Sequence, residues 1–347
     1  MLMPQRTPRM PGARSTGTGA AVVLALALAG CASTPAPSVV NPHRTPIGIG
    51  SPSTDPFWAS QSPLPSSPAP TKPKPSAAAP DRSQLPRGGT KLFPRYRLVG
   101  YSGGEASKAF GRLGVGNLDT RISELERTGR GYTAGGRQML PVLELITVIV
   151  HASPGKDGKY RSRIDEAQIA RYLAAARRHK ALLLLNIQPG RADFLPEVQA
   201  LQRWLAEPDV GIALDPEWAV GKSQTPGRVF GQTTATELNS VAAYLSTFTR
   251  AHGLPEKAMV VHQLAPRIIH RIQDVRTHAG VAIVLSVDGI GARSDKEATW
   301  RKLVKPLPVA VRPGFKLFFE EDREHGKLMT PAQVLALKPT PDYVIYE

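Results

Sequence analysis

Residues 181–218 read ALLLLNIQPGRADFLPEVQALQRWLAEPDVGIALDPEW. Two short apolar runs, Ala181–Ile187 and Val210–Leu214, flank a segment with helical periodicity, Leu195–Ala206. Near-continuous apolar runs are typical of parallel strands that are covered on both faces, and the helix between them supplies the crossover. The stretch therefore predicts one β–α–β unit with two parallel strands.

The same alternation continues on both sides of this unit. The predicted strands are Tyr96–Tyr101, Met139–Val150, Ala181–Ile187, Val210–Leu214, Ala258–His262, Val281–Val287, Gly314–Phe319 and Tyr343–Tyr346. The predicted helices are Leu118–Arg127, Asp165–His179, Leu195–Ala206, Thr234–His252, Pro266–Arg276, Asp295–Val304 and Pro331–Leu337. Eight such units in about 255 residues match an α/β fold of the (β/α)₈ TIM-barrel type. An open doubly wound sheet is the main alternative, but no G-x-G-x-x-G motif follows the first strand.

The first 30 residues have the parts of an export signal. Arginines precede an apolar stretch, Ala20–Ala29, which is too short to span a bilayer. The residues that close this stretch, Leu28-Ala29-Gly30-Cys31, resemble the bacterial lipobox, which implies cleavage before Cys31 and lipidation of that cysteine. We therefore expect a lipoprotein that is anchored through Cys31 to the cell membrane, on its extracellular face. An ordinary secretory signal with an incidental cysteine is the alternative.

Residues 31–92 are predicted to be a disordered linker, and residues 93–347 the barrel domain. Fourteen of the 33 prolines lie between Ser33 and Arg87, together with many Ser, Ala and Thr residues. Such a composition cannot bury enough apolar surface to offset the entropy of ordering. Cys31 is the only cysteine, so the domain contains no disulfide bond and must be stabilised by its core.

The chain carries a formal net charge of +16, spread along its length. Because no dense basic run is interleaved with aromatic residues, we do not expect a nucleic acid as partner. A diffuse positive charge suits a protein close to anionic lipids or wall polymers. We expect a monomer without a cofactor.

Polar residues stand at the C-terminal ends of the predicted strands. In a barrel, chemistry gathers at that end, because the loops there surround an open mouth. We predict substrate-binding roles for Glu144, Asn186, Gln188, Trp218, His262, Asp288 and Lys316. A charged Glu144 inside an apolar strand needs a partner, and Lys316 across the barrel is the expected one. That pair could equally do no more than close the core.

Four acidic residues are the predicted catalytic groups. Glycosidases hydrolyse a bond between two carboxyl groups, one protonated and one ionised. Barrel glycosidases commonly place the acid after the fourth strand and the nucleophile after the seventh, where Glu217 and Glu320 or Glu321 stand. Asp215 shares a face with Glu217 if the fourth strand continues. Trp218 offers a flat surface to a sugar ring. The sequence thus predicts a hydrolase of cell-envelope or extracellular glycans.

Two alternatives to the glycosidase stay open. The first is a non-catalytic module that binds a glycan or small molecule, or associates with the cell wall, through the same mouth. The second is a divalent-metal hydrolase using Glu144, Asp215, Glu217, His262 and Asp288. No H-x-H or H-E-x-x-H spacing supports a metal, and we predict none; nor does a G-x-S-x-G motif support serine catalysis.

Four segments resemble a family of uncharacterised actinobacterial secreted proteins and predicted lipoproteins. They are Leu185–Arg191 (LNIQPGR), Gly211–Trp218 (GIALDPEW), Val261–Gln263 (VHQ) and Pro331–Leu337 (PAQVLAL). The resemblance covers nearly all of residues 96–347 and implies a barrel behind an export signal, without supplying a reaction. In that family an acidic residue often occupies the position of Asn186. This chain departs from the pattern there, which argues against an enzyme if that carboxylate is functional.

Overall fold

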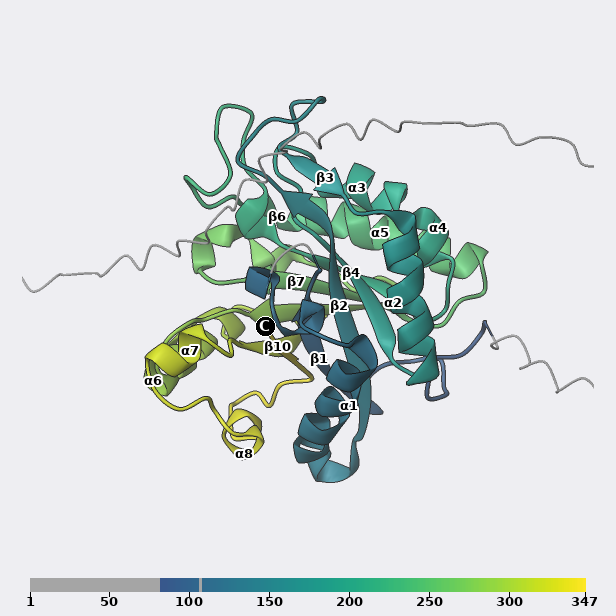
Figure 1. Ribbon diagram of the computed structural model, residues 1–347, viewed down its shortest axis with the longest axis vertical. Coiled ribbons are helices and arrows are strands. Elements are labelled where there is room, and N and C mark those ends of the chain that lie inside the picture. The colour runs from purple at the N-terminus through teal and green to yellow at the C-terminus, as the bar shows by residue number, and fades with distance from the viewer. Residues whose placement is uncertain (1–81, 106–107) are drawn as a thin grey trace, which may run out of the picture.

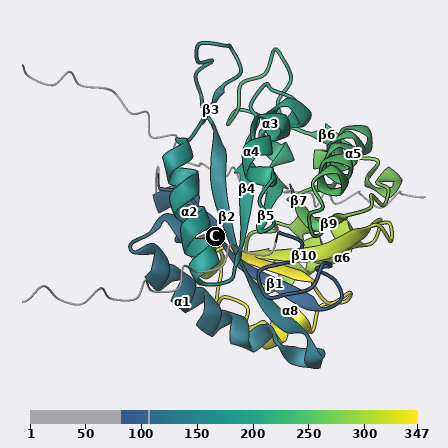
Figure 2. The same cartoon turned by 90° about the vertical axis from the view of Figure 1, so that its right-hand side faces the viewer.

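The computed structural model describes residues 82–105 and 108–347. Eight parallel strands form a closed barrel, because β1 pairs with both β2 and β11 (Figures 1 and 2). In barrel order they are β1 (Tyr96–Gly103), β2 (Gln138–Val150), β4 (Leu182–Ile187), β5 (Val210–Leu214), β7 (Lys257–Gln263), β9 (Val281–Val287), β10 (Val311–Leu317) and β11 (Tyr343–Tyr346). The predicted TIM-type fold is confirmed.

Helices surround the barrel, as Figure 2 shows. They are α1 (Leu118–Gly129), α2 (Glu166–Arg178), α3 (Phe194–Ala200), α4 (Gln202–Leu205), α5 (Ala235–Ala251), α6 (Arg293–Val304), α7 (Glu321–Glu324) and α8 (Pro331–Leu335). Side-chain caps fix several starts: Asn117 accepts from Thr120 N at α1, and Thr234 accepts from Glu237 N at α5. Such caps satisfy N–H groups that the first turn leaves unpaired.

The strands alternate between two apolar clusters. Outward-facing residues pack against the helices in the larger cluster, whereas the inner cluster fills the lower barrel with residues such as Leu98, Val142, Leu184 and Val260. The barrel interior is narrow at Gly211, where a Cβ atom would lie 2.6 Å from the carbonyl oxygen of Ala258. The lower barrel is therefore a packed core, and an open site is possible only at its C-terminal end.

The chain before β1 closes the N-terminal end of the barrel. Leu85, Leu92 and Phe93 belong to the inner cluster. Tyr96 OH donates to the carbonyl oxygens of Arg87 and Gly88, both at 2.7 Å. The packed domain therefore extends N-terminally of the start we expected at Phe93.

The helix predicted at Pro266–Arg276 is wrong. Two 3₁₀ turns, η6 (Pro266–Ile268) and η7 (Ile272–Asp274), flank the short strand β8 (Ile269–His270). This strand pairs with β6 (Thr233–Thr234), and Arg271 adopts a left-handed conformation with φ 58° that interrupts any helix. The apolar residues that suggested a helix are nevertheless buried in the larger cluster: Ile268, Ile269, Ile272 and Val275. Burial of these residues in a segment without helical structure produced the apolar spacing that suggested a helix.

Two further elements differ from the prediction. The helix expected at Leu195–Ala206 is divided into α3 and α4 at Leu201, whose φ and ψ of −96° and 6° are not helical. The strand β3 (Arg161–Arg163) pairs antiparallel with the end of β2 and was not predicted, because three polar residues carry no strand pattern.

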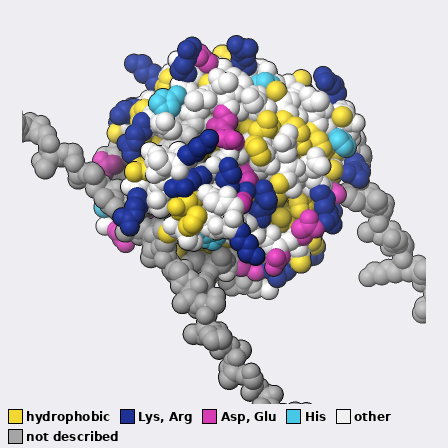
Figure 3. Space-filling model, turned by 90° about the horizontal axis from the view of Figure 1, so that it is seen from above, with side chains coloured by type: hydrophobic (Ala, Val, Ile, Leu, Met, Phe, Trp, Pro, Cys, Tyr) yellow, Lys and Arg dark blue, Asp and Glu magenta, His cyan; other side chains and the backbone are white. Residues whose placement is uncertain are grey.

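The predicted signal peptide, Cys31 and the predicted linker up to Asp81 lie outside the described residues. Within the described part of the chain, no helix is both long and apolar enough to cross a membrane. Lys and Arg side chains lie at separate places on the face seen in Figure 3, with Asp and Glu among them.

Candidate functional site

A layer of polar side chains fills the C-terminal end of the barrel, above the inner apolar cluster. Along β2, Leu140 and Val142 belong to that cluster, and Glu144, two residues further, is fully buried in the layer. We call this set the polar layer. Its members lie on the barrel strands or directly after them, and all are buried: Ser102, Glu144, Asn186, Asp215, His262, Ser286, Asp288, Lys316 and Tyr343. The period of two along each strand thus brings the polar residues to one level.

Glu144 is held at the centre of this layer. Its Oε1 accepts from Ser102 Oγ at 3.2 Å and Asn186 Nδ2 at 3.1 Å, and its Oε2 accepts from Tyr343 OH at 2.6 Å. Burial by itself would raise the pKa of Glu144, but the charge of His262 and these contacts outweigh burial and lower it. Glu144 is therefore an ionised anchor whose oxygens are already occupied.

His262 lies between three carboxylates. Its Nδ1 is 2.8 Å from Asp288 Oδ2, and its Nε2 is 3.0 Å from Glu144 Oε1 and 3.8 Å from Asp215 Oδ1. The Nε2 contact with Glu144 is ionic and not an aligned hydrogen bond. Burial lowers the pKa of His262, but the three negative charges raise it well above its usual value. His262 is thus an imidazolium cation.

Lys316 contacts Asp288 and Glu347, and the direct pair with Glu144 that we predicted does not form. Its Nζ lies 3.1 Å from Asp288 Oδ2 and 2.5 Å from Glu347 Oε2. The reason is the strand order: β10 lies between β9 and β11, whereas β2 is separated from it by β11 and β1. Lys316 acts on Glu144 only through its charge.

Asp288 is a second ionised carboxylate of the layer. It accepts from Ser286 Oγ at 2.7 Å in addition to its contacts with His262 and Lys316. Burial would raise its pKa, but the two cations outweigh burial and lower the pKa of Asp288 to about 2. Its oxygens, like those of Glu144, are committed.

Asp215 and Glu217 lie where β5 turns away from the barrel. The strand ends at Leu214, and the 3₁₀ turn η5 (Pro216–Trp218) follows, so the condition under which these two residues would share a strand face is not met. Asp215 accepts from Asn186 Nδ2 at 3.0 Å. Oε2 of Glu217 is buried and has no hydrogen-bond partner among the described residues. Glu217 as a whole is partly exposed, so its carboxyl group reaches inward from the rim.

The two carboxyl groups differ in proton affinity. Burial raises the pKa of Asp215 to about 6, against the opposing charges of His262 and Lys316. Burial and the negative charges of Asp215 and Asp288 raise the pKa of Glu217 to about 8. Near neutral pH, Glu217 is therefore protonated beside an ionised Asp215. Carboxyl groups with pKa values pushed apart in this way are typical of acid–base catalysis.

The carboxylates after the seventh barrel strand lie differently. Glu320 is exposed, and nothing in the described structure brings it to the polar layer. Glu321 is half-buried, and burial together with the negative charge of Glu347 raises its pKa. The neighbouring Asp322 is structural, because it binds Lys296 Nζ at 2.9 Å.

Gln188 and Trp218 lie beside the layer. Gln188 Oε1 accepts from Val150 N at 3.3 Å and so supports the extended end of β2. Trp218 is partly exposed in η5, at the rim where Glu217 stands.

Sequence reasoning missed Ser102, Ser286, Tyr343 and Glu347. Ser102 and Ser286 continue the inward period of their strands, and Tyr343 lies in the apolar run YVIY that reads as core. An alternation count along each strand would have found the two serines. Only the closed barrel brings Tyr343 OH to Glu144.

In the described part of the chain, no group of three or more His, Cys, Asp or Glu side chains is arranged to hold a metal ion. The carboxylates of the polar layer instead contact the cations His262 and Lys316. That donor set offers no open group of hard oxygen ligands.

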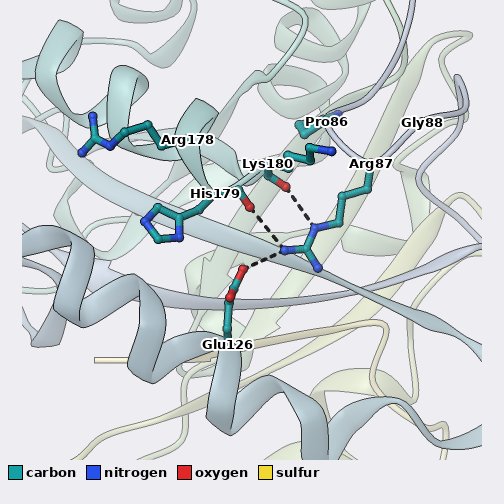
Figure 4. A pocket seen from close by; sticks show the side chains of 7 residues that line it. All are labelled: Pro86, Arg87, Gly88, Glu126, Arg178, His179 and Lys180. Carbon is teal, nitrogen blue, oxygen red and sulfur yellow. Dashed lines mark hydrogen bonds and ion pairs between the residues drawn. The ribbon is translucent and has the colours of Figure 1, made fainter.

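A surface hollow of about 700 Å³ lies at the opposite end of the barrel. Figure 4 shows Arg87 in it, bound to Glu126 and to the backbone of His179 and Lys180. Arg87 Nη1 also donates to the carbonyl oxygen of Met139 at 3.0 Å. Each guanidinium nitrogen is therefore engaged in attaching the N-terminal segment to the barrel, and we assign the hollow no ligand.

Comparison with known proteins adds no family to this geometry. No family model matches the chain, and no curated protein matches it. The resemblance carried by the LDPEW segment stays a prediction.

Proposed function

We propose that the chain is a glycoside hydrolase whose general acid is Glu217 and whose ionised partner is Asp215. The observation that carries the proposal is the pair itself: a carboxyl group with pKa about 8 and an unpartnered buried oxygen, beside one with pKa about 6. Glu217 donates its proton to the leaving oxygen of the glycosidic bond. Asp215 stabilises the positive charge that develops on the sugar or activates the water.

Asp215 suits the second role better than Glu320, the residue expected from its place after the seventh strand. Asp215 lies inside the polar layer, and among the described residues it accepts a side-chain hydrogen bond from Asn186 alone, whereas Glu320 is exposed. Glu144 and Asp288 are less suitable, because their oxygens are occupied by several donors.

The charge of the layer supports this chemistry. Three carboxylates, Glu144, Asp215 and Asp288, share the cations His262 and Lys316, and Lys316 is also shared with Glu347. The layer is therefore net negative. Fixed negative charge in a buried site stabilises an oxocarbenium-like transition state, since no solvent has to reorganise as that charge appears.

The test is the release of reducing ends from a panel of glycans by the wild type and by Glu217→Gln. Turnover by the wild type that is lost in the variant supports the proposal. Equal, negligible rates for both overturn it. Glycan binding retained by both proteins would then favour the binding module. That module also agrees with Glu144 and Asp288, whose oxygens already accept hydrogen bonds from other residues of the protein.

The pH dependence of kcat/KM is expected to be bell-shaped. Activity falls as the pH drops through about 6, because Asp215 takes up a proton, and falls as it rises through about 8, because Glu217 loses one. The two limbs belong to the interacting pair and not to either residue alone. Initial rates measured from about pH 4 to about pH 10 check this. A profile that stays flat above pH 8 contradicts the acid role of Glu217.

The export and anchoring of this hydrolase are also proposals. They rest on the lipobox at Leu28–Cys31 and on the Pro-rich sequence after it. We expect Cys31→Ser to move the protein from the membrane fraction to the soluble or secreted fraction, because a serine cannot form the thioether to the lipid. Incorporation of a labelled fatty acid into the wild type, and its absence from Cys31→Ser, checks the prediction. Label in both proteins would contradict it.

A further inference from the structure

Asn186 presents a buried oxygen that has no donor. Its Nδ2 donates to Glu144 Oε1 at 3.1 Å and Asp215 Oδ1 at 3.0 Å. These bonds fix the orientation of the amide, because the reverse orientation would set its oxygen against two carboxylates. Oδ1 therefore faces away from both, in a residue only 2% exposed, with no partner among the described residues. A buried acceptor without a donor costs about 1–3 kcal/mol, so it calls for a donor from a ligand.

The donors of the polar layer are already committed. Tyr343 OH and Ser102 Oγ bind Glu144, and Ser286 Oγ binds Asp288. His262 and Lys316 are surrounded by carboxylates, as described above. Within the described structure the unpartnered atoms of the mouth are Asn186 Oδ1, Glu217 Oε2 and His262 Nε2. His262 Nε2 lies 3.0 Å from Glu144 Oε1 and 3.8 Å from Asp215 Oδ1, so its charge is directed at those carboxylates. The proton of Glu217 is the one that the proposed reaction consumes. What the mouth lacks is a donor that no carboxylate already holds, in surroundings of net negative charge.

We infer that the sugar bound beside Glu217 carries a free amine on the carbon next to the cleaved bond, so that the substrate class is a glycan of unacetylated amino sugars. This inference rests on the proposed hydrolase. A protonated amine has three N–H donors and a positive charge. One such amine has donors for both Asn186 Oδ1 and the Asp215 carboxylate, which Asn186 Nδ2 holds at 3.0 Å on the other branch of the same amide. Asp215 stands two residues before the acid, at the end of β5, so both acceptors belong to the same part of the mouth as Glu217.

Other substituents on the same carbon suit the mouth less well. An acetamido group has one N–H and adds a carbonyl oxygen, for which the polar layer has no uncommitted side-chain donor. A hydroxyl group satisfies Asn186 Oδ1 but leaves the negative charge uncompensated. A sugar that bears a carboxylate is repelled by Asp215 and Glu144.

The inference is tested by binding to the full chain, which requires no turnover. Glucosamine and galactosamine are each compared with the N-acetylated sugar and with the parent hexose, by calorimetry near neutral pH. We expect the free amine to bind at least about tenfold more tightly than the parent hexose. Asp215→Asn keeps the shape and an acceptor for Asn186 but removes the charge, and should abolish this preference. Glu320→Gln, which changes an exposed glutamate, serves as the control and should keep it.

The possible results separate the inference from the proposed function. Equal affinity for amine and hexose, or tighter binding of the N-acetylated sugar, overturns the inference. Hydrolysis of neutral glycans without any preference for the amine also overturns it, while the hydrolase stands. Preferential binding of the amine without turnover of any glycan supports the inference and overturns the hydrolase.

Discussion

Glu217→Gln is expected to lower kcat on the susceptible glycan by about 10²–10⁴-fold, the usual contribution of a positioned general acid. Glutamine fills the same volume but has no acidic proton to give to the leaving oxygen. The substitution should leave KM nearly unchanged, because Glu217 contributes a proton and makes few contacts. Since glutamine is neutral, like the protonated Glu217, the alkaline limb of the pH profile should disappear as well.

The matched control is Glu320→Gln, the same change at an exposed glutamate after the seventh barrel strand. We expect it to retain wild-type kcat. If Glu320→Gln were inactive and Glu217→Gln active, the assignment of Glu217 as the acid would be incorrect, and Glu320 would be the residue that matters.

A second measurement compares substrates whose leaving groups differ in acidity. The loss of rate in Glu217→Gln should be smallest for the substrate with the most acidic leaving group, because that group needs least protonation.

His262→Ala is expected to lower the free energy of unfolding by about 3–5 kcal/mol, the cost of leaving buried charges unpaired. His262 is fully buried and contacts Asp288 and Glu144 through its two ring nitrogens. Without the imidazolium, both carboxylates lose their central counter-charge. His325→Ala, at an exposed position, is the control and should change the free energy by less than about 0.5 kcal/mol. Urea denaturation of the three proteins at one pH measures both effects.

The destabilisation by His262→Ala should depend on pH. In the wild type, the lowered pKa of Asp288, about 2, contributes stability above the pKa of the unfolded chain, and this contribution is lost as the pH falls through about 2. The raised pKa of His262 contributes stability at pH values below the usual histidine pKa. This contribution is lost as the pH rises through the pKa that His262 has in the folded protein. In the variant both contributions are absent, so the difference from the wild type should shrink in acid, where Glu144 and Asp288 take up protons. A difference that grows in acid would contradict the charge network.

The segments that the sequence predicted well are those whose pattern is local. Apolar runs such as Leu182–Ile187 and Val210–Leu214 are buried on both faces, so their composition records their place in the sheet. The helix predicted at Pro266–Arg276 failed for the opposite reason. Its apolar residues are buried through contacts with β6 and the barrel, which the local pattern does not contain.

The candidate site divides in the same way. The sequence by itself determined that polar residues such as Glu144, Asn186 and His262 stand at inward positions near the ends of strands, because the side-chain period of a strand is fixed at two. It could not decide which of them touch, since partners in the layer come from strands up to 199 residues apart, as with Glu144 and Tyr343.

Only the tertiary structure decided that Lys316 binds Asp288 and Glu347, and that Glu217 stays protonated beside Asp215 while Glu320 lies in solvent. The physical reason is that strand order sets which charges are neighbours, and burial sets what an unpaired charge costs. Both are properties of the closed ring of strands, and neither is present in a short stretch of sequence.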